Sequence, residues 1–271
     1  MLPSFRNHFL WLLIGSEAMR IARFIVLAAV TCGALAAQPQ SLRVLIRSSA
    51  KTHGAPDNSR HDYPAFLAGW TKLLTARGAV VDGAPRFPTA DELLRTDVLI
   101  DYASDGANVS PAERVVLDEY LKRGGGLVVI HDGMCGSDAA WFATVAGGAK
   151  QHGERNSSAG KLKLHFEDPA NPILAGMSDF EMDDEMFFLL RMAPEAHVLA
   201  TSPDPTGKIV PQLWTYERTL PGGRPYRAFV TLQGHLYANF EQSAYQTILL
   251  RGIAWAGKRP LNGLLLNAAV Q

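Results

Sequence analysis

Gly124-Gly125-Gly126-Leu127-Val128-Val129-Ile130-His131 is the stretch of sequence that decides the fold class. Four apolar residues, mostly branched at the β-carbon, follow a glycine break and end at a histidine. A short unbroken apolar run indicates a strand buried on both faces, as in a parallel sheet covered by helices. Open parallel sheets bind ligands outside the carboxyl ends of their strands. His131 stands at such an end, which makes it the first candidate for a functional residue.

The segments around this strand alternate between short apolar runs and amphipathic helices. Strands are predicted at 42–47, 79–81, 98–100, 161–166, 198–200, 212–216 and 227–231, and helices at 64–77, 110–123 and 241–256, with a short helix opening at the capping box 89–92. This alternation predicts an α/β fold with a doubly wound, mostly parallel sheet flanked by helices in a single domain.

The N-terminus has the features of a secretory signal peptide. Residues 19–36 combine a basic start, an apolar run and the small-x-small cleavage pattern Ala34-Leu35-Ala36. We therefore assign 1–36 to a signal peptide, in which 1–18 is an over-extended start, and 37–271 to one α/β domain. The mature protein is expected in the periplasm or outside the cell, without stable membrane insertion. An uncleaved membrane anchor is the alternative.

Composition excludes several other classes of protein. The chain has 271 residues, a formal net charge of 0 and 47% hydrophobic residues. Such a balance gives no basic field to attract nucleic acid, so we expect no nucleic-acid partner.

Removal of the signal peptide would leave Cys135 as the single cysteine, so no internal disulfide can form. The sequence contains no P-loop, GxGxxG, HExxH or CxxC motif.

Two histidines and an acidic pair are the main candidates for chemistry. Like His131, His235 closely follows a predicted strand, and parallel strands share one carboxyl edge. Histidine at that edge suits proton transfer near neutral pH or metal ligation. We therefore expect a catalytic pocket formed by His131, His235, Asp184 and Glu185. Of these, His131, His235 and Glu185 are candidate ligands of a divalent metal, with zinc or manganese as the suitable ions.

Each of these residues also has a structural interpretation. His131 could be a core histidine that only hydrogen-bonds a neighbouring loop, and the acidic triplet 183–185 could be a solvated loop. Cys135 invites a nucleophile interpretation, as in a glutamine amidotransferase elbow. The predicted turn after the strand holds His131 instead of a cysteine, so we expect Cys135 to be dispensable.

Several short motifs together resemble the ThuA-like family, named for trehalose utilisation, whose fold is similar to class I glutamine amidotransferases without their cysteine. The matching stretches are GGGLVVIHDG, the run from Trp141-Phe142 through Gly147-Gly148 to His152, Asp184-Glu185, QLW ending at Trp214, LQGH ending at His235, and RGIAWAGKR, within residues 42–259. One departure is Asn171-Pro172-Ile173, where members often carry His-Pro-Ile.

The resemblance implies a carbohydrate-utilisation protein, in pathways that include 3-keto sugars. It also implies that His152 lines the pocket and that Trp141 and Trp214 stack against a sugar, although both tryptophans could be core residues. We add His61, in the polar stretch 48–62, to the substrate-binding candidates.

We therefore expect an exported hydrolase, lyase or isomerase that acts on a sugar or 3-keto-glycoside through histidine and carboxylate groups. A non-catalytic sugar-binding or scaffolding module of the same fold is the alternative.

Overall fold

The computed structural model describes residues 40–52 and 59–266, so the predicted signal peptide, residues 1–36, lies outside the described residues. The described residues from 41 on belong to one compact unit. In residues 40–52 and 59–266, no helix combines the length and the apolar character needed to cross a membrane.

The first half of the main sheet is parallel. Its strands are β1 (Arg43–Arg47), β2 (Val80–Ala84), β3 (Val98–Asp101), β4 (Gly126–Ile130) and β12 (Pro225–Thr231). They pair in the order β2-β1-β3-β4-β12, each parallel to its neighbour. β4 and β12 are therefore adjacent, and their carboxyl ends lie at the same edge of the sheet.

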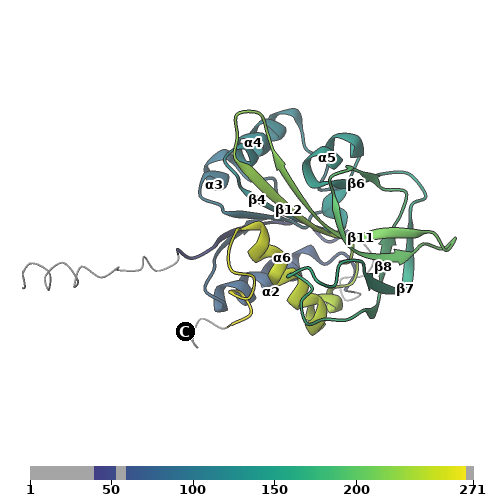
Figure 1. Cartoon of the computed structure of the whole chain (residues 1–271). Helices are drawn as coiled ribbons and strands as arrows, with labels where there is room; N and C mark the ends of the chain where they lie inside the picture. Colours follow the sequence, from purple (N-terminus) through teal and green to yellow (C-terminus); the bar gives the residue numbers. More distant parts are fainter. Residues whose placement is uncertain (1–39, 53–58, 267–271) are drawn as a thin grey trace, which may run out of the picture. The chain divides into compact units, whose positions relative to one another are not determined.

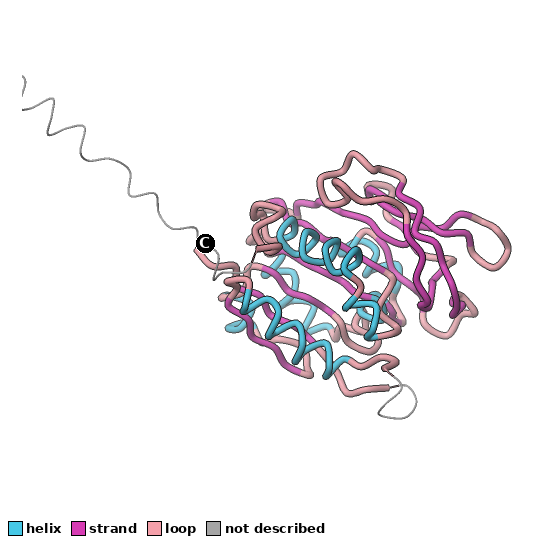
Figure 2. Tube along the Cα trace, turned by 90° about the horizontal axis from the view of Figure 1, so that it is seen from below, coloured by secondary structure: helices cyan, strands magenta, loops and turns pink. Residues whose placement is uncertain are grey.

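The second half of the same sheet is antiparallel. Its strands are β7 (Ser157–Phe166), β8 (Phe180–Phe187), β10 (His197–Pro203) and β11 (Ile209–Thr219), and the order continues from β12 as β11-β10-β7-β8. A separate small sheet pairs β5 (Cys135–Gly136), β6 (Gly148–Gln151) and β9 (Arg191–Met192). In Figure 2, strands extend at one end of the molecule beyond the region where the helices gather.

Helices cover both faces of the parallel strands (Figure 1). One face carries α2 (Tyr63–Ala76) and α6 (Ser243–Ala256), and the other carries α3 (Ala90–Leu94), α4 (Pro111–Lys122) and α5 (Ala139–Ala146). The capping boxes predicted at Thr89 and Ser110 both form. The predicted doubly wound α/β class is thus confirmed, with a longer antiparallel extension than the parallel pattern alone indicates.

Strand β4 shows why the glycine-rich stretch decides the fold. Val128 and Ile130 belong to the core that packs against α2 and α6, whereas Leu127 and Val129 belong to the core beneath α4 and α5. All five residues of the strand are buried. A strand covered on both faces has no place for a polar side chain, which explains the unbroken apolar run.

Some predicted boundaries and one alternative were wrong. The second strand runs from Val80 to Ala84, and the closing helix begins at Ser243 after a short 3₁₀ turn, Tyr237–Glu241. The acidic triplet 183–185 is no solvated loop but lies inside β8. Alternation along that strand turns Asp184 inward and leaves Asp183 exposed.

Candidate metal site

Four side chains from distant parts of the sequence meet at the carboxyl edge of the sheet. His131 begins the 3₁₀ turn η1 (His131–Met134) directly after β4, and His235 follows the adjacent strand β12. Their ring centroids lie 5.6 Å apart. Glu185 reaches them from β8, and His61 from the residues that precede α2. One ligand atom from each side chain lies within 4.8 Å of the other three.

Three ring nitrogens and one carboxylate oxygen point toward a common centre. His61 Nε2 lies 3.1 Å from His131 Nε2 and 2.7 Å from His235 Nδ1. Glu185 Oε2 lies 3.5 Å from His131 Nε2 and 3.1 Å from His235 Nδ1. Facing ring nitrogens repel unless a proton or a cation lies between them, because each neutral imidazole presents a lone pair there.

A hydrogen bond behind the cluster fixes the orientation of one of these rings. His131 Nδ1 lies 2.7 Å from the carbonyl oxygen of Leu232, which can only accept, so Nδ1 carries a proton and donates it. The lone pair of the neutral ring is then on Nε2, the atom that faces Glu185 and His61. The ring is also stacked on Phe187, with centroids 4.6 Å apart.

The backbone is held in an uncommon conformation at the same place. His61 has a φ of 45° and His131 a φ of 49°, both in the left-handed region that non-glycine residues seldom occupy. Gly234 has a φ of 151°, and a β-carbon there would lie 2.9 Å from the β-carbon of His131. A non-glycine residue with a positive φ, such as His61 or His131, destabilises the fold by on the order of 1–3 kcal/mol, and such residues cluster at functional sites. Local strain therefore coincides with the histidine cluster.

Asp184 supports the cluster from behind. Its carboxylate accepts hydrogen bonds from the backbone N–H groups of Gly234 at 3.0 Å, His235 at 2.9 Å and Glu185 at 2.6 Å. The side chain of Asn239 donates to it as well. Burial raises the pKa of Asp184, although the charge on His131 and these donors act in the opposite direction. Asp184 therefore fixes the backbone that carries two members of the cluster.

Electrostatics favour a positive charge at the centre of the cluster. Burial opposes the charged form of His131, but the hydrogen bond to Glu185 and the charges of Asp132, Asp184 and Glu185 outweigh it and raise its pKa to about 9. Burial likewise opposes ionisation of Glu185, yet hydrogen bonds to His131 and His235 hold its pKa far below the usual value. The charges around the cluster thus favour a proton there, and the same charges favour a metal cation.

The donor set fits a divalent transition metal. Imidazole nitrogens and a carboxylate oxygen are the ligands that zinc accepts, at about 2.0–2.1 Å. Tetrahedral bonds of that length place neighbouring ligand atoms roughly 3.3 Å apart. Four of the six pairs of ligand atoms lie at 2.7–3.5 Å, and all six lie within 4.8 Å. Side-chain exposure is 0–11% for the three histidines and 18% for Glu185, so the carboxylate is the most accessible member.

The other sequence-predicted site residues lie outside this cluster. His152 is exposed and pairs with Asp105 at 2.6 Å. The guanidinium of Arg114 lies over the ring of Trp141, with its Cζ 3.7 Å from the ring centroid. Trp214 is fully buried and donates from its indole N–H to the carbonyl of Ala146 at 2.9 Å. The predicted sugar-stacking role of Trp214 is therefore wrong, because its ring belongs to the core.

The sequence predicts only a substrate-binding role for His61 and no role for Asp132. In the structure, His61 Nε2 lies between two other histidines, so His61 is a fourth member of the cluster. Asp132 directly follows His131, and that adjacency is the one signal in the sequence for it. Its side chain lies 3.3 Å from His61 Nδ1, and the neighbouring charges of His131 and His61 hold its pKa below the usual value against the effect of burial.

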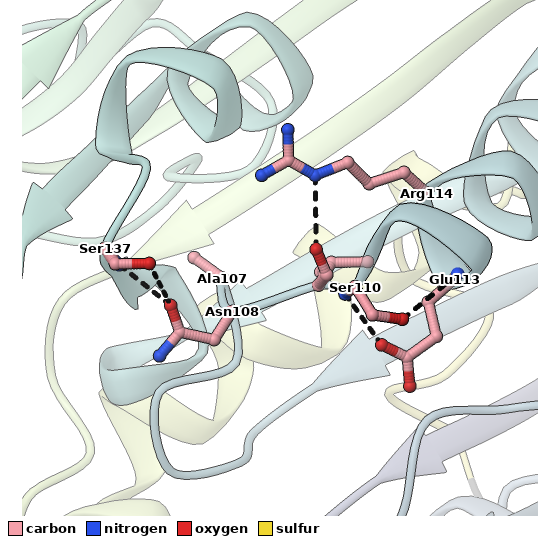
Figure 3. Close-up of a pocket in the computed structure, with 7 residues that line it drawn as sticks. Ala107, Asn108, Ser110, Glu113, Arg114 and Ser137 are labelled. Carbon is pink, nitrogen blue, oxygen red and sulfur yellow. Dashed lines mark hydrogen bonds between the residues drawn. The ribbon is translucent and has the colours of Figure 1, made fainter.

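A pocket of about 300 Å³ opens beside His235. It is lined by Arg60, Ala159, Gly160, Asp183, Asp184, His235 and Leu236. A second pocket, of about 340 Å³, lies by the start of α4 (Figure 3). There Asn108 accepts hydrogen bonds from Ser137, and Ser110 and Glu113 cap the helix. Only the first of these two pockets is bordered by a member of the histidine cluster.

Comparisons with known proteins agree with the fold. A family model described as ThuA, trehalose utilisation, matches residues 43–256. A ThuA-like protein from Parabacteroides merdae is similar in structure, with 18% identity, a TM-score of 0.62, and coverage of 80% of this chain and 90% of that one. A ThuA-like protein from Bacteroides uniformis gives 17% identity, a TM-score of 0.61 and coverage of 83% and 95%.

A β-galactosidase from G. stearothermophilus also resembles the chain, with 15% identity and a TM-score of 0.50. The match covers 86% of this chain but 33% of the galactosidase. No curated protein matches the sequence. Likeness at these identities concerns the fold alone.

Proposed function

The chain belongs to the ThuA family of trehalose-utilisation proteins, and we propose that it is a metal-assisted enzyme acting on a sugar or 3-keto-glycoside. The observation that supports this is the cluster of His61, His131, His235 and Glu185, whose ligand atoms lie within 4.8 Å of one another. Family membership supports the carbohydrate substrate, and the donor chemistry supports the metal.

In this proposal the three imidazoles would hold a divalent cation, and Glu185 would accept a proton. Catalytic zinc sites commonly have three protein ligands and keep one position for water or substrate. The histidines are the most buried members, and His131 is held by its hydrogen bond to Leu232. A divalent ion bound there would act as a Lewis acid on a substrate oxygen.

Glu185 is placed to accept a proton at its Oε2. Its low pKa keeps it ionised at neutral pH, so its oxygens present lone pairs that can accept a proton. The backbone N–H of Glu185 donates a hydrogen bond to Asp184, and this bond fixes the backbone from which the Glu185 carboxylate reaches the histidines. The pocket beside His235 has a volume of about 300 Å³, enough space for a small sugar next to these groups.

Turnover of 3-keto-glycosides by purified protein, with and without a chelator, tests the proposal. We expect turnover that depends on added zinc or manganese. His131→Ala and His235→Ala should lose the metal, whereas Glu185→Gln should keep most of it and lose about 10²–10⁴-fold in kcat. Full turnover in the presence of a chelator would contradict metal assistance. Saturable sugar binding without turnover would favour the non-catalytic sugar-binding module instead.

We further propose that the protein is exported. The basis is the basic start, apolar run and Ala34-x-Ala36 pattern within residues 1–36. Export would place the site in the periplasm or outside the cell.

A further inference from the structure

Asp132 occupies a central position behind the histidine cluster. Its Oδ2 accepts a hydrogen bond from the hydroxyl of Tyr63 at 2.8 Å and lies 3.3 Å from His61 Nδ1. Its Oδ1 lies 3.5 Å from the sulfur of Cys135. The side chain is 13% exposed. Asp132 thus contacts three side chains, two of which, His61 and Tyr63, belong to a segment about 70 residues earlier in the chain.

The contact with His61 favours one tautomer of its ring. A carboxylate can only accept hydrogen bonds, so Asp132, whose Oδ2 lies 3.3 Å from His61 Nδ1, favours the ring protonated at Nδ1. Thr52 Oγ1 also lies 3.2 Å from this nitrogen, but a hydroxyl can donate or accept and so does not select a tautomer. The lone pair is then on Nε2, the atom that faces His131 and His235.

The backbone of His61 is fixed separately from its ring. Its N–H donates to the carbonyl of His235 at 2.9 Å, and Arg60 forms an antiparallel bridge with Leu236. These contacts bring the segment to the cluster, but rotation of the imidazole about its own bonds stays possible. The Asp132 carboxylate limits that rotation, and Tyr63, at the start of α2, limits the movement of Asp132.

We infer that Asp132 is a positioning residue that holds the His61 ring, in the tautomer protonated at Nδ1, with Nε2 directed at the metal-binding centre. Tyr63 in turn orients Asp132. This inference rests on the proposed metal-dependent function for its consequence on metal affinity, but the tautomer of His61 does not depend on the metal.

Loss of a carboxylate that orients a metal-binding histidine typically weakens metal affinity about 10–100-fold. We therefore expect Asp132→Asn to reduce the zinc affinity of the protein by this factor, and Asp132→Glu to restore part of it. Tyr63→Phe removes only the hydroxyl that holds Asp132, so a loss of less than about tenfold is expected. Asp105→Asn is the matched control, because Asp105 pairs with exposed His152 outside the cluster.

Zinc affinity is measured by competition with a chromophoric chelator, and the His61 tautomer by nitrogen-15 NMR of the metal-free protein. The expected result is a proton on His61 Nδ1 in the wild type, a mixed tautomer in Asp132→Asn, and unchanged zinc affinity in Asp105→Asn. Tyr63→Phe keeps the test available if Asp132→Asn does not fold.

Two outcomes would overturn the inference: a wild-type His61 protonated at Nε2, or Asp132→Asn that binds zinc as tightly as the wild type. A wild type that binds no divalent metal would instead contradict the proposed function, and the NMR result would still decide the role of Asp132.

Discussion

Replacing Glu185 with glutamine should remove a pH-dependent part of the stability of the metal-free protein. Glu185 Oε2 lies 3.5 Å from His131 Nε2. Of the groups around His131, Glu185 contributes the hydrogen bond that most raises its pKa. Glutamine has nearly the same shape but no charge. The substitution should therefore preserve the packing of β8 and remove the electrostatic stabilisation of protonated His131.

The size of the effect follows from the pKa of His131. The rise from 6.5 to about 9 corresponds to roughly 3 kcal/mol, at about 1.4 kcal/mol per pKa unit. Asp132 and Asp184 also contribute to this rise, so loss of Glu185 alone should remove on the order of 2 kcal/mol. A raised folded-state pKa stabilises the fold fully below the unfolded value of 6.5, and this stabilisation is lost as pH rises through about 9.

Urea unfolding in the presence of a chelator, at pH 6 and at pH 10, measures this difference. Glu185→Gln should lower the free energy of unfolding by about 2 kcal/mol more at pH 6 than at pH 10. The control is Glu181→Gln, an exposed position on the same strand, which should behave alike at both pH values. An equal loss at pH 6 and pH 10 for Glu185→Gln would refute the proposed pairing with His131.

Four further outcomes are expected. Zinc affinity should rise with pH until about pH 9, by about tenfold per pH unit for each proton displaced, because His131 must first lose its proton; a flat isothermal-titration series would contradict this. Ala159→Trp should fill the pocket beside the cluster, so KM for a 3-keto-glycoside should rise at least about tenfold while zinc affinity stays unchanged. Lys161→Trp, at an exposed position on the same strand, is the control and should leave KM unchanged. Cys135→Ala should leave turnover nearly unchanged, since burial raises the pKa of its thiol; a loss of about a thousandfold would restore the nucleophile interpretation. Mass spectrometry of the exported protein should find its N-terminus near Ala37, and retained residues 1–36 would show that the segment is not cleaved.

The sequence was sufficient to predict the meeting of His131 and His235. Both follow apolar runs, and a run buried on both faces implies a parallel sheet, whose strands share one carboxyl edge. Adjacency of β4 and β12 could not be predicted, because almost 100 residues separate them and strand order depends on packing of the whole domain. Because all parallel strands of a sheet end at the same edge, the two histidines could be placed at that edge without knowledge of the strand order.

The place of His61 could not be predicted in the same way. It lies in a polar stretch without periodicity, so no strand or helix pattern indicates its direction. Its position depends on long-range contacts, namely the Arg60–Leu236 bridge and its own hydrogen bond to His235.

For Trp214 the sequence predicted a functional role that the structure does not support. Motif position suggested a binding role, whereas β11 is buried on both faces around it.

The arrangement of the cluster argues for selection on binding rather than on folding. Replacement of buried ionic groups by apolar residues of similar volume is often neutral or stabilising, so stability alone gives little reason to gather three imidazoles and a carboxylate. Two of these histidines also have a positive φ, at a cost on the order of 1–3 kcal/mol each. A ligand that binds only the folded state would offset such a cost, by about 2.7 kcal/mol at one hundred times its Kd. The proposed cation would therefore explain strain, charge and donor geometry at one sheet edge together.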